Sequence, residues 1–156
     1  SNGNTERIAK MLQKEIGGDI VRIDTLTPYE GSYDDVVNQG QEEVQRGYEP
    51  EIKPLGVNIS DYDVIAVGTP TWWYTMAPAV RTFLHTESFA DKTVIPFMTN
   101  AGWPGNVIKD MKTACKGADI KGEMEIQFDS TGGSRLETPM EDITKWIQNV
   151  KQIIND

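Results

Sequence analysis

Three polar, glycine-containing segments are the parts of this sequence best suited to bind a ligand. The first segment opens the chain and reads Ser1, Asn2, Gly3, Asn4 and Thr5. These residues are poor helix formers, yet Ile8, Leu12 and Ile16 follow them at the spacing of one helical face. The start of such a helix presents unpaired N–H groups and the positive end of the helix dipole, which favour a phosphate. An ordinary helix cap at Asn4 or Thr5 is the alternative.

The second segment, residues 68–75, is rich in aromatic side chains. Behind an apolar run it contains, in order, Pro70, Thr71, Trp72, Trp73 and Tyr74. Large aromatic side chains in a turn at the end of a strand usually mark a binding surface, because water would otherwise surround them. The alternative is that one or both tryptophans point into the core.

The third segment carries a further tryptophan between two glycines. It reads Thr99, Asn100, Ala101, Gly102, Trp103, Pro104, Gly105 and Asn106. Because glycine lacks a side chain, the backbone N–H groups beside it can approach a ligand closely. The second and third segments together would therefore enclose a planar, partly polar ring and contact its edge.

The rest of the chain supplies the elements that must position these segments. Short apolar runs, typical of strands, lie at residues 20–23, 64–67, 94–98 and 124–128. Helical patterns lie between and after them, over about 5–16, 33–46, from about 75, across 107–115 and from about 139. This alternation predicts a single α/β domain over residues 1–156, with a parallel sheet covered by helices.

The order of these elements brings the three segments together. In an open parallel sheet, ligands bind at the carboxyl ends of the strands, so we expect one site built from all three segments. A helix that starts near Thr5 of such a domain should follow a central strand, and the loss of a central strand leaves two neighbours unpaired. We therefore expect a further strand upstream of Ser1.

Charge and composition restrict the classes of partner. The net charge of −9 argues against nucleic acid and is compatible with a basic protein partner. Residues 30–51 hold seven acids and one base, Arg46, which is also typical of a solvated helix face. No apolar run approaches the roughly 20 residues of a membrane span. We expect a cytoplasmic location. Because the residues upstream of Ser1 are not given, export or lipid anchoring stays open.

Few side chains could act as acids, bases, nucleophiles or metal ligands. The chain has one cysteine and one histidine, which excludes an internal disulfide and argues against a His-ligated metal or a Ser-His-Asp triad. We expect Cys115 in the core and His85 at the surface or in a cap. No catalytic residue and no metal site is predicted.

With its three segments in this order, the chain resembles flavodoxins, and especially short-chain flavodoxin-like proteins. In those proteins a phosphate loop ending in Gly-Asn-Thr, a Trp-Trp loop and a Gly-rich loop after the fourth strand enclose FMN. The matching stretches here are residues 1–5, 68–78 and 99–106, and the resemblance spans nearly the whole chain.

The resemblance implies a fold and a role for each segment. The fold would be a three-layer α/β/α sandwich whose five-stranded parallel sheet has the order 2-1-3-4-5, with its first strand missing from this sequence. Residues 1–5 would hold the FMN phosphate without any lysine or arginine. Residues 70–74 would run along the isoalloxazine ring, and residues 99–106 would close its other side and edge.

The sequence departs from the family pattern at two points. Tyr74 stands where the family usually has glycine after the Trp pair, and a backbone flip near the flavin is easiest at glycine. In the third segment, Asn100, Ala101, Trp103 and Pro104 replace a run such as His-Gly-Gly. We expect a more enclosed flavin.

Other nucleotide sites fit less well. Asp24 lies about twenty residues after Gly3, where a dinucleotide-binding fold has an acid for the ribose, but that fingerprint needs three glycines. The first segment also lacks the Gly-Lys-Ser/Thr of a P-loop. A flavin-free binding module with the same fold is a further alternative.

Two functions remain within the flavin interpretation. An electron carrier binds FMN and presents the ring edge to a protein, whereas an NAD(P)H-dependent FMN or quinone reductase must leave space for a nicotinamide over the ring. Trp72, Trp73 and Trp103 crowd the ring, and the acidic residues 30–51 suit a basic redox protein. We therefore favour the carrier; the sequence does not predict the oligomeric state.

Overall fold

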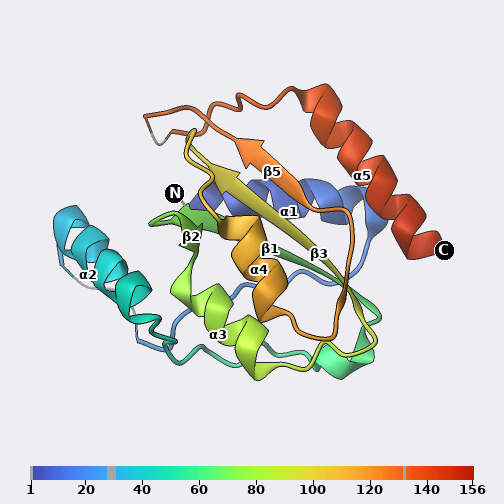
Figure 1. Cartoon of the computed structure of the whole chain (residues 1–156). Helices are drawn as coiled ribbons and strands as arrows, with labels where there is room; N and C mark the ends of the chain where they lie inside the picture. Colours follow the sequence, from blue (N-terminus) through green and yellow to red (C-terminus); the bar gives the residue numbers. More distant parts are fainter. Residues whose placement is uncertain (1, 28–30, 132) are drawn as a thin grey trace.

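The computed structural model describes residues 2–27, 31–131 and 133–156 (Figure 1). Its helices are α1 (Asn2–Ile16), α2 (Tyr33–Arg46), α3 (Pro78–Thr86), α4 (Val107–Ala114) and α5 (Met140–Asn155), with a short 3₁₀ turn, η1 (Ile59–Asp61). Its strands are β1 (Val64–Trp72), β2 (Thr75–Met76), β3 (Thr93–Asn100), β4 (Asp119–Ile120) and β5 (Met124–Gln127). The five predicted helices and the strands predicted at 64–67, 94–98 and 124–128 are confirmed. The helix expected from about 75 begins only at Pro78, because β1 continues to Trp72 and Thr75–Met76 pairs with it as β2.

The sheet is built around the parallel pair β1 and β3. Their register runs from Val64 opposite Thr93 to Pro70 opposite Thr99. On its other edge β3 pairs in parallel with β4 near its start and with β5 near its end. β2 turns back and pairs antiparallel with the last residues of β1. The order is therefore β2-β1-β3-β4, with β5 following β4 along the same edge of β3.

Helices cover both faces of this sheet and give the three-layer α/β/α architecture that the sequence predicts. On one face α3 and α4 pack with β1 and β3 around Val67, Phe83, Val94, Met98 and Met111. On the other face α1 and α5 enclose the second core cluster, formed by Ile8, Leu12, Ile95, Phe97, Ile126, Phe128, Ile143, Trp146, Ile147 and Val150. Successive β3 side chains alternate between the two clusters, as the pleat of a strand buried on both faces requires.

The prediction of a strand at residues 20–23 is wrong for this structure. Ile20 and Val21 are 43% and 37% exposed, and the nearest ladder contact is an isolated antiparallel bridge between Thr25 and Ile52. Strand geometry needs a neighbour at hydrogen-bond distance. Among the described residues no strand flanks this segment, so the predicted 2-1-3-4-5 order is incomplete here.

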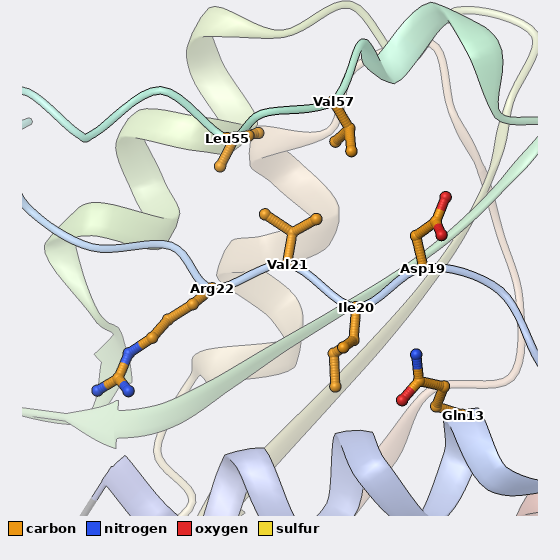
Figure 2. Close-up of a pocket in the computed structure, with 7 residues that line it drawn as sticks. All are labelled: Gln13, Asp19, Ile20, Val21, Arg22, Leu55 and Val57. Carbon is orange, nitrogen blue, oxygen red and sulfur yellow. The ribbon is translucent and has the colours of Figure 1, made fainter.

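An open surface pocket of about 590 Å³ lies beside this segment (Figure 2). In the close-up Val21 points toward Leu55 and Val57, and Ile20 points the opposite way, toward α1. The residues that line the pocket are Gln13, Asp19, Ile20, Val21, Arg22, Leu55 and Val57. The strand expected upstream of Ser1 stays a prediction.

Close contact between the two central strands leads to a first prediction. Gly68 lies opposite Phe97, and a Cβ at Gly68 would come 2.3 Å from the buried Phe97 ring. Gly68→Ala should therefore lower the free energy of unfolding by about 1–3 kcal/mol, the usual penalty for overpacking a core. Urea unfolding followed by far-UV circular dichroism measures this change.

The matched control replaces the ring instead. In a Phe97→Leu background the added methyl group meets a smaller side chain, so the penalty of Gly68→Ala should shrink. An equal penalty in both backgrounds would show that the ring contact is not its cause.

Candidate functional site

Direct hydrogen bonds bring the three predicted segments together at the carboxyl edge of the sheet. The Thr5 and Thr99 hydroxyl oxygens lie 2.8 Å apart, so α1 touches the end of β3. The Thr71 hydroxyl donates to the Thr99 carbonyl at 3.3 Å. The N–H of Asn106 donates to the Tyr74 carbonyl at 2.8 Å. The three segments therefore contact one another at this edge.

The first segment is already helical. α1 begins at Asn2, three residues before the predicted start near Thr5, so Gly3, Asn4 and Thr5 belong to its first turns. Ser1 lies outside the described residues. The Asn4 side chain is 9% exposed, and its amide donates to the Gly133 carbonyl at 3.0 Å. This segment thus offers the first-turn N–H groups of α1 and the Thr5 hydroxyl to a ligand.

The second segment forms a tight β-hairpin between β1 and β2. Trp72 pairs with Thr75, which leaves Trp73 and Tyr74 as a two-residue loop. Both loop residues have positive φ, 50° and 67°. A loop of this kind normally uses Asn-Gly, because side-chained residues rarely adopt left-handed backbone angles. A pair of aromatic residues here is strained and must be held by its surroundings.

The aromatic side chains of this hairpin lie at the surface. Trp73 is 36% exposed and Tyr74 is 59% exposed, while Trp72 is half-buried. The alternative in which both tryptophans enter the core is therefore wrong. Pro70 and Thr71, also half-buried, lead into the turn from β1.

The third segment closes against the hairpin. The Asn100 carboxamide oxygen accepts the N–H of Gly102 at 2.7 Å, which shapes the turn after β3. Gly105 lies against the Tyr74 backbone, where a Cβ would come 2.3 Å from the Tyr74 carbonyl oxygen. Trp103 is 56% exposed. Of the other residues, Thr99 is buried, Ala101 is half-buried and Asn106 is exposed.

A fourth segment, around Asp129 and Gly133, was missed by the sequence reasoning. Its Gly133 and Ser134 carbonyls accept hydrogen bonds from Asn4 and Arg7 of α1, each at 3.0 Å. The available signal was an acid followed by glycines directly after the last strand. This segment therefore holds the first turns of α1 through Asn4 and Arg7.

The Asp129 carboxylate organises that fourth segment. It accepts the Thr131 hydroxyl at 2.8 Å and the N–H groups of Gly133 at 2.7 Å and Arg135 at 3.0 Å. These hydrogen bonds, that of Thr131 foremost, hold the pKa of Asp129 below its ordinary value of 3.8. The carboxylate is therefore ionised at neutral pH.

The described part of the chain contains no grouping of acids, histidine and cysteine able to hold a metal ion. Cys115 is buried as predicted, and burial raises the pKa of its thiol to about 11, so it is not a thiolate at neutral pH. His85, on α3, pairs with Glu49, with 2.9 Å between the ring Nδ1 and a carboxylate oxygen. None of the helices described is long and apolar enough to cross a membrane.

Comparisons with known proteins agree on the fold. The family described as Flavodoxin matches residues 1–150. A candidate flavoprotein from Bacteroides eggerthii DSM 20697 aligns with a TM-score of 0.74 and 28% identity, over 94% of this chain and 90% of that one. A similar candidate from Bacteroides uniformis ATCC 8492 gives 0.73 and 26%, over 94% and 91%.

A more distant likeness extends this set. The structure of a flavoprotein in complex with FMN from Lactobacillus acidophilus NCFM aligns with a TM-score of 0.67 and 19% identity, over 79% of this chain and 85% of that one. At this identity the likeness shows the fold. Among the curated proteins, no relative matches the chain.

The bonds around Asp129 predict a pH-dependent stability. Asparagine supplies one acceptor oxygen where the carboxylate supplies two, so Asp129→Asn should destabilise the protein at neutral pH. Because the folded-state pKa is lowered, the carboxylate contributes its stability above the unfolded pKa and loses it as the pH falls through the folded pKa. The gap in unfolding free energy between wild type and variant should therefore be constant above about pH 5 and shrink toward about pH 3.

Urea unfolding across this pH range measures the gap. Glu137→Gln is the matched control, because Glu137 lies in the same stretch and pairs through its side chain with exposed Arg135. A gap for Asp129→Asn that does not change with pH would contradict the role given to the carboxylate.

Proposed function

We propose that this chain, which belongs to the flavodoxin family, binds FMN at the carboxyl edge of its sheet and transfers electrons to or from a protein partner. The observation that carries the proposal is the 2.8 Å contact between the Thr5 and Thr99 hydroxyls, which joins α1 to the third segment. The third segment is joined in turn to the aromatic hairpin through Thr71 and Tyr74. A phosphate group on the first turn of α1 would then lie beside the aromatic hairpin. A flavoprotein with the same fold has a structure in complex with FMN.

The chemistry of the donor groups fits this cofactor. The first turns of α1 offer N–H groups around Gly3 and the Thr5 hydroxyl, which suit a phosphate without a basic side chain. We assign the phosphate to Ser1, Asn2, Gly3, Asn4 and Thr5, although the Asn4 amide is already used by Gly133. Asn4 would therefore contact the phosphate through its backbone N–H group.

The aromatic hairpin and the third segment suit the flavin ring. We assign the ring to residues 70–74 on one side and to Thr99, Asn100, Ala101, Gly102, Trp103, Gly105 and Asn106 on the other. Because the Asn106 to Tyr74 bond joins the two segments, both would hold the ring in one rigid frame. Bound FMN supplies the redox chemistry, while the chain binds, orients and partly shields it.

The surface around the site favours a protein partner. Tyr74 and Trp103 are 59% and 56% exposed at the tip of the site. α2 stands beside the hairpin beyond the strand ends (Figure 1), and carries Asp34, Asp35 and Glu42 on its surface. An apolar tip next to an acidic helix suits a basic redox protein, since complementary charge steers the encounter.

Anaerobic visible spectroscopy tests this function. We expect FMN to bind with a Kd of about 1 μM or tighter and riboflavin at least about tenfold more weakly, because riboflavin lacks the phosphate. On adding NADPH the oxidised spectrum should persist, whereas dithionite should bleach it. The NADPH arm separates carrier from reductase, because hydride transfer needs a nicotinamide stacked over the ring.

Two outcomes would contradict the proposal. Rapid bleaching by NADPH would assign the chain to the NAD(P)H-dependent reductases. Failure to take up FMN would leave a flavin-free module with this fold.

A further inference from the structure

We propose that α2 is a positioning element of the site, which holds Trp72 and Trp73 through Gly40 and the Val37 carbonyl. The inference rests on the proposed function, because α2 would position the two indoles against the flavin ring. It assigns a role in cofactor binding to a helix that lies outside all three predicted segments. Gly40 and Val37 are the residues that carry it.

Two contacts join α2 to the hairpin. The Trp73 indole N–H donates to the Val37 carbonyl at 2.9 Å. The Trp72 indole lies directly on the helix at Gly40, where a Cβ would come 2.1 Å from its Nε1 atom and 2.5 Å from its Cε2 atom. Residues three apart share one face of a helix, so both indoles rest on the same face of α2.

The hairpin needs this support because of its backbone conformation. Trp73 and Tyr74 both have positive φ, which residues with side chains adopt only when the surrounding structure imposes it. The third segment holds the turn through Asn106 and Gly105. α2 holds the two indoles, so the turn is fixed both at its backbone and at its side chains.

α2 is capped at its start and joined to α3 just after its end. Its start has a capping box, in which Ser32 and Asp35 exchange backbone and side-chain hydrogen bonds. Just after its end, the Pro50 carbonyl accepts the Thr82 hydroxyl of α3 at 2.6 Å, and Glu49 pairs with His85 at 2.9 Å. These contacts hold the C-terminal end of α2 against α3.

α2 is a surface helix that is buried only locally, around Gly40. Among its residues whose burial is described, Gly40 and Glu43 are buried and the rest are half-buried or exposed. Neither Val37 nor Gly40 belongs to the two core clusters. A change at Gly40 should therefore act on Trp72 and leave the core intact.

Gly40→Ala tests the proposal, because the new methyl group must displace the Trp72 indole. We expect the Kd values for FMN and riboflavin to rise by the same factor, about tenfold, since the ring is common to both ligands. The near-UV circular dichroism of the apoprotein should change, as should the midpoint potential of bound FMN. Gln45→Ala, at an exposed position of the same helix, is the matched control and should change none of these.

A double-mutant cycle with Trp72→Phe identifies the contact. Phenylalanine leaves room at Gly40, so the effect of Gly40→Ala on flavin affinity should largely disappear in that background. An undiminished effect would show that Gly40 acts through some other residue and would overturn the proposal.

The remaining outcomes are equally decisive. If Gly40→Ala binds both flavins within twofold of the Gln45→Ala control, the proposal is overturned. A loss of affinity for FMN but not for riboflavin would also overturn it, because α2 would then act on the phosphate. Loss of cooperative unfolding in Gly40→Ala would make α2 a folding element instead. If wild-type protein takes up no flavin, the proposed function fails, while the apoprotein dichroism still reports whether Gly40 positions Trp72.

Discussion

The parallel pairing of β1 and β3 is the constraint on which the site depends. With Pro70 opposite Thr99, both strands end at the same edge of the sheet, and their following loops must leave side by side. The helix α1 reaches this edge on one face, where Thr5 meets Thr99. The meeting of segments far apart in the sequence therefore follows from a single strand register.

The same edge concentrates the strain of the fold. The Trp73 and Tyr74 backbone angles are unfavourable for side-chained residues, yet the neighbouring contacts of Asn106, Gly105 and α2 hold them. Strain of this kind commonly accompanies a site that must be rigid before its ligand arrives. In the proposed site, a hairpin held in this way would fix the position of a planar cofactor before it binds.

Much of this could be predicted from sequence, because the signals were local. Periodic apolar residues marked the helices, and the apolar runs at 64–67 and 94–98 marked the two strands buried on both faces. Glycine and aromatic clusters marked the segments in which those strands end and the following turns begin. Their convergence followed from element order, which requires no knowledge of side-chain contacts.

The failures were non-local. Residues 20–23 have a strand-like pattern, but pairing is a property of two segments, and no described strand flanks them. The contacts of Asn4 with Gly133 and of Trp73 with Val37 join residues far apart in the sequence, so no spacing rule could reveal them. The left-handed turn at Trp73 and Tyr74 also ran against local preference, because its tertiary surroundings decide it.

Nuclear magnetic resonance of the ¹⁵N-labelled protein titrated with FMN tests the location of the site most directly. The account predicts that the largest amide shifts fall in residues 2–5, 71–74 and 100–106, together with the indole signals of Trp72, Trp73 and Trp103. Amides of α5 beyond its first turn should remain nearly unchanged. Largest shifts around the surface pocket beside Ile20 and Val21, or shifts spread evenly over the chain, would contradict it.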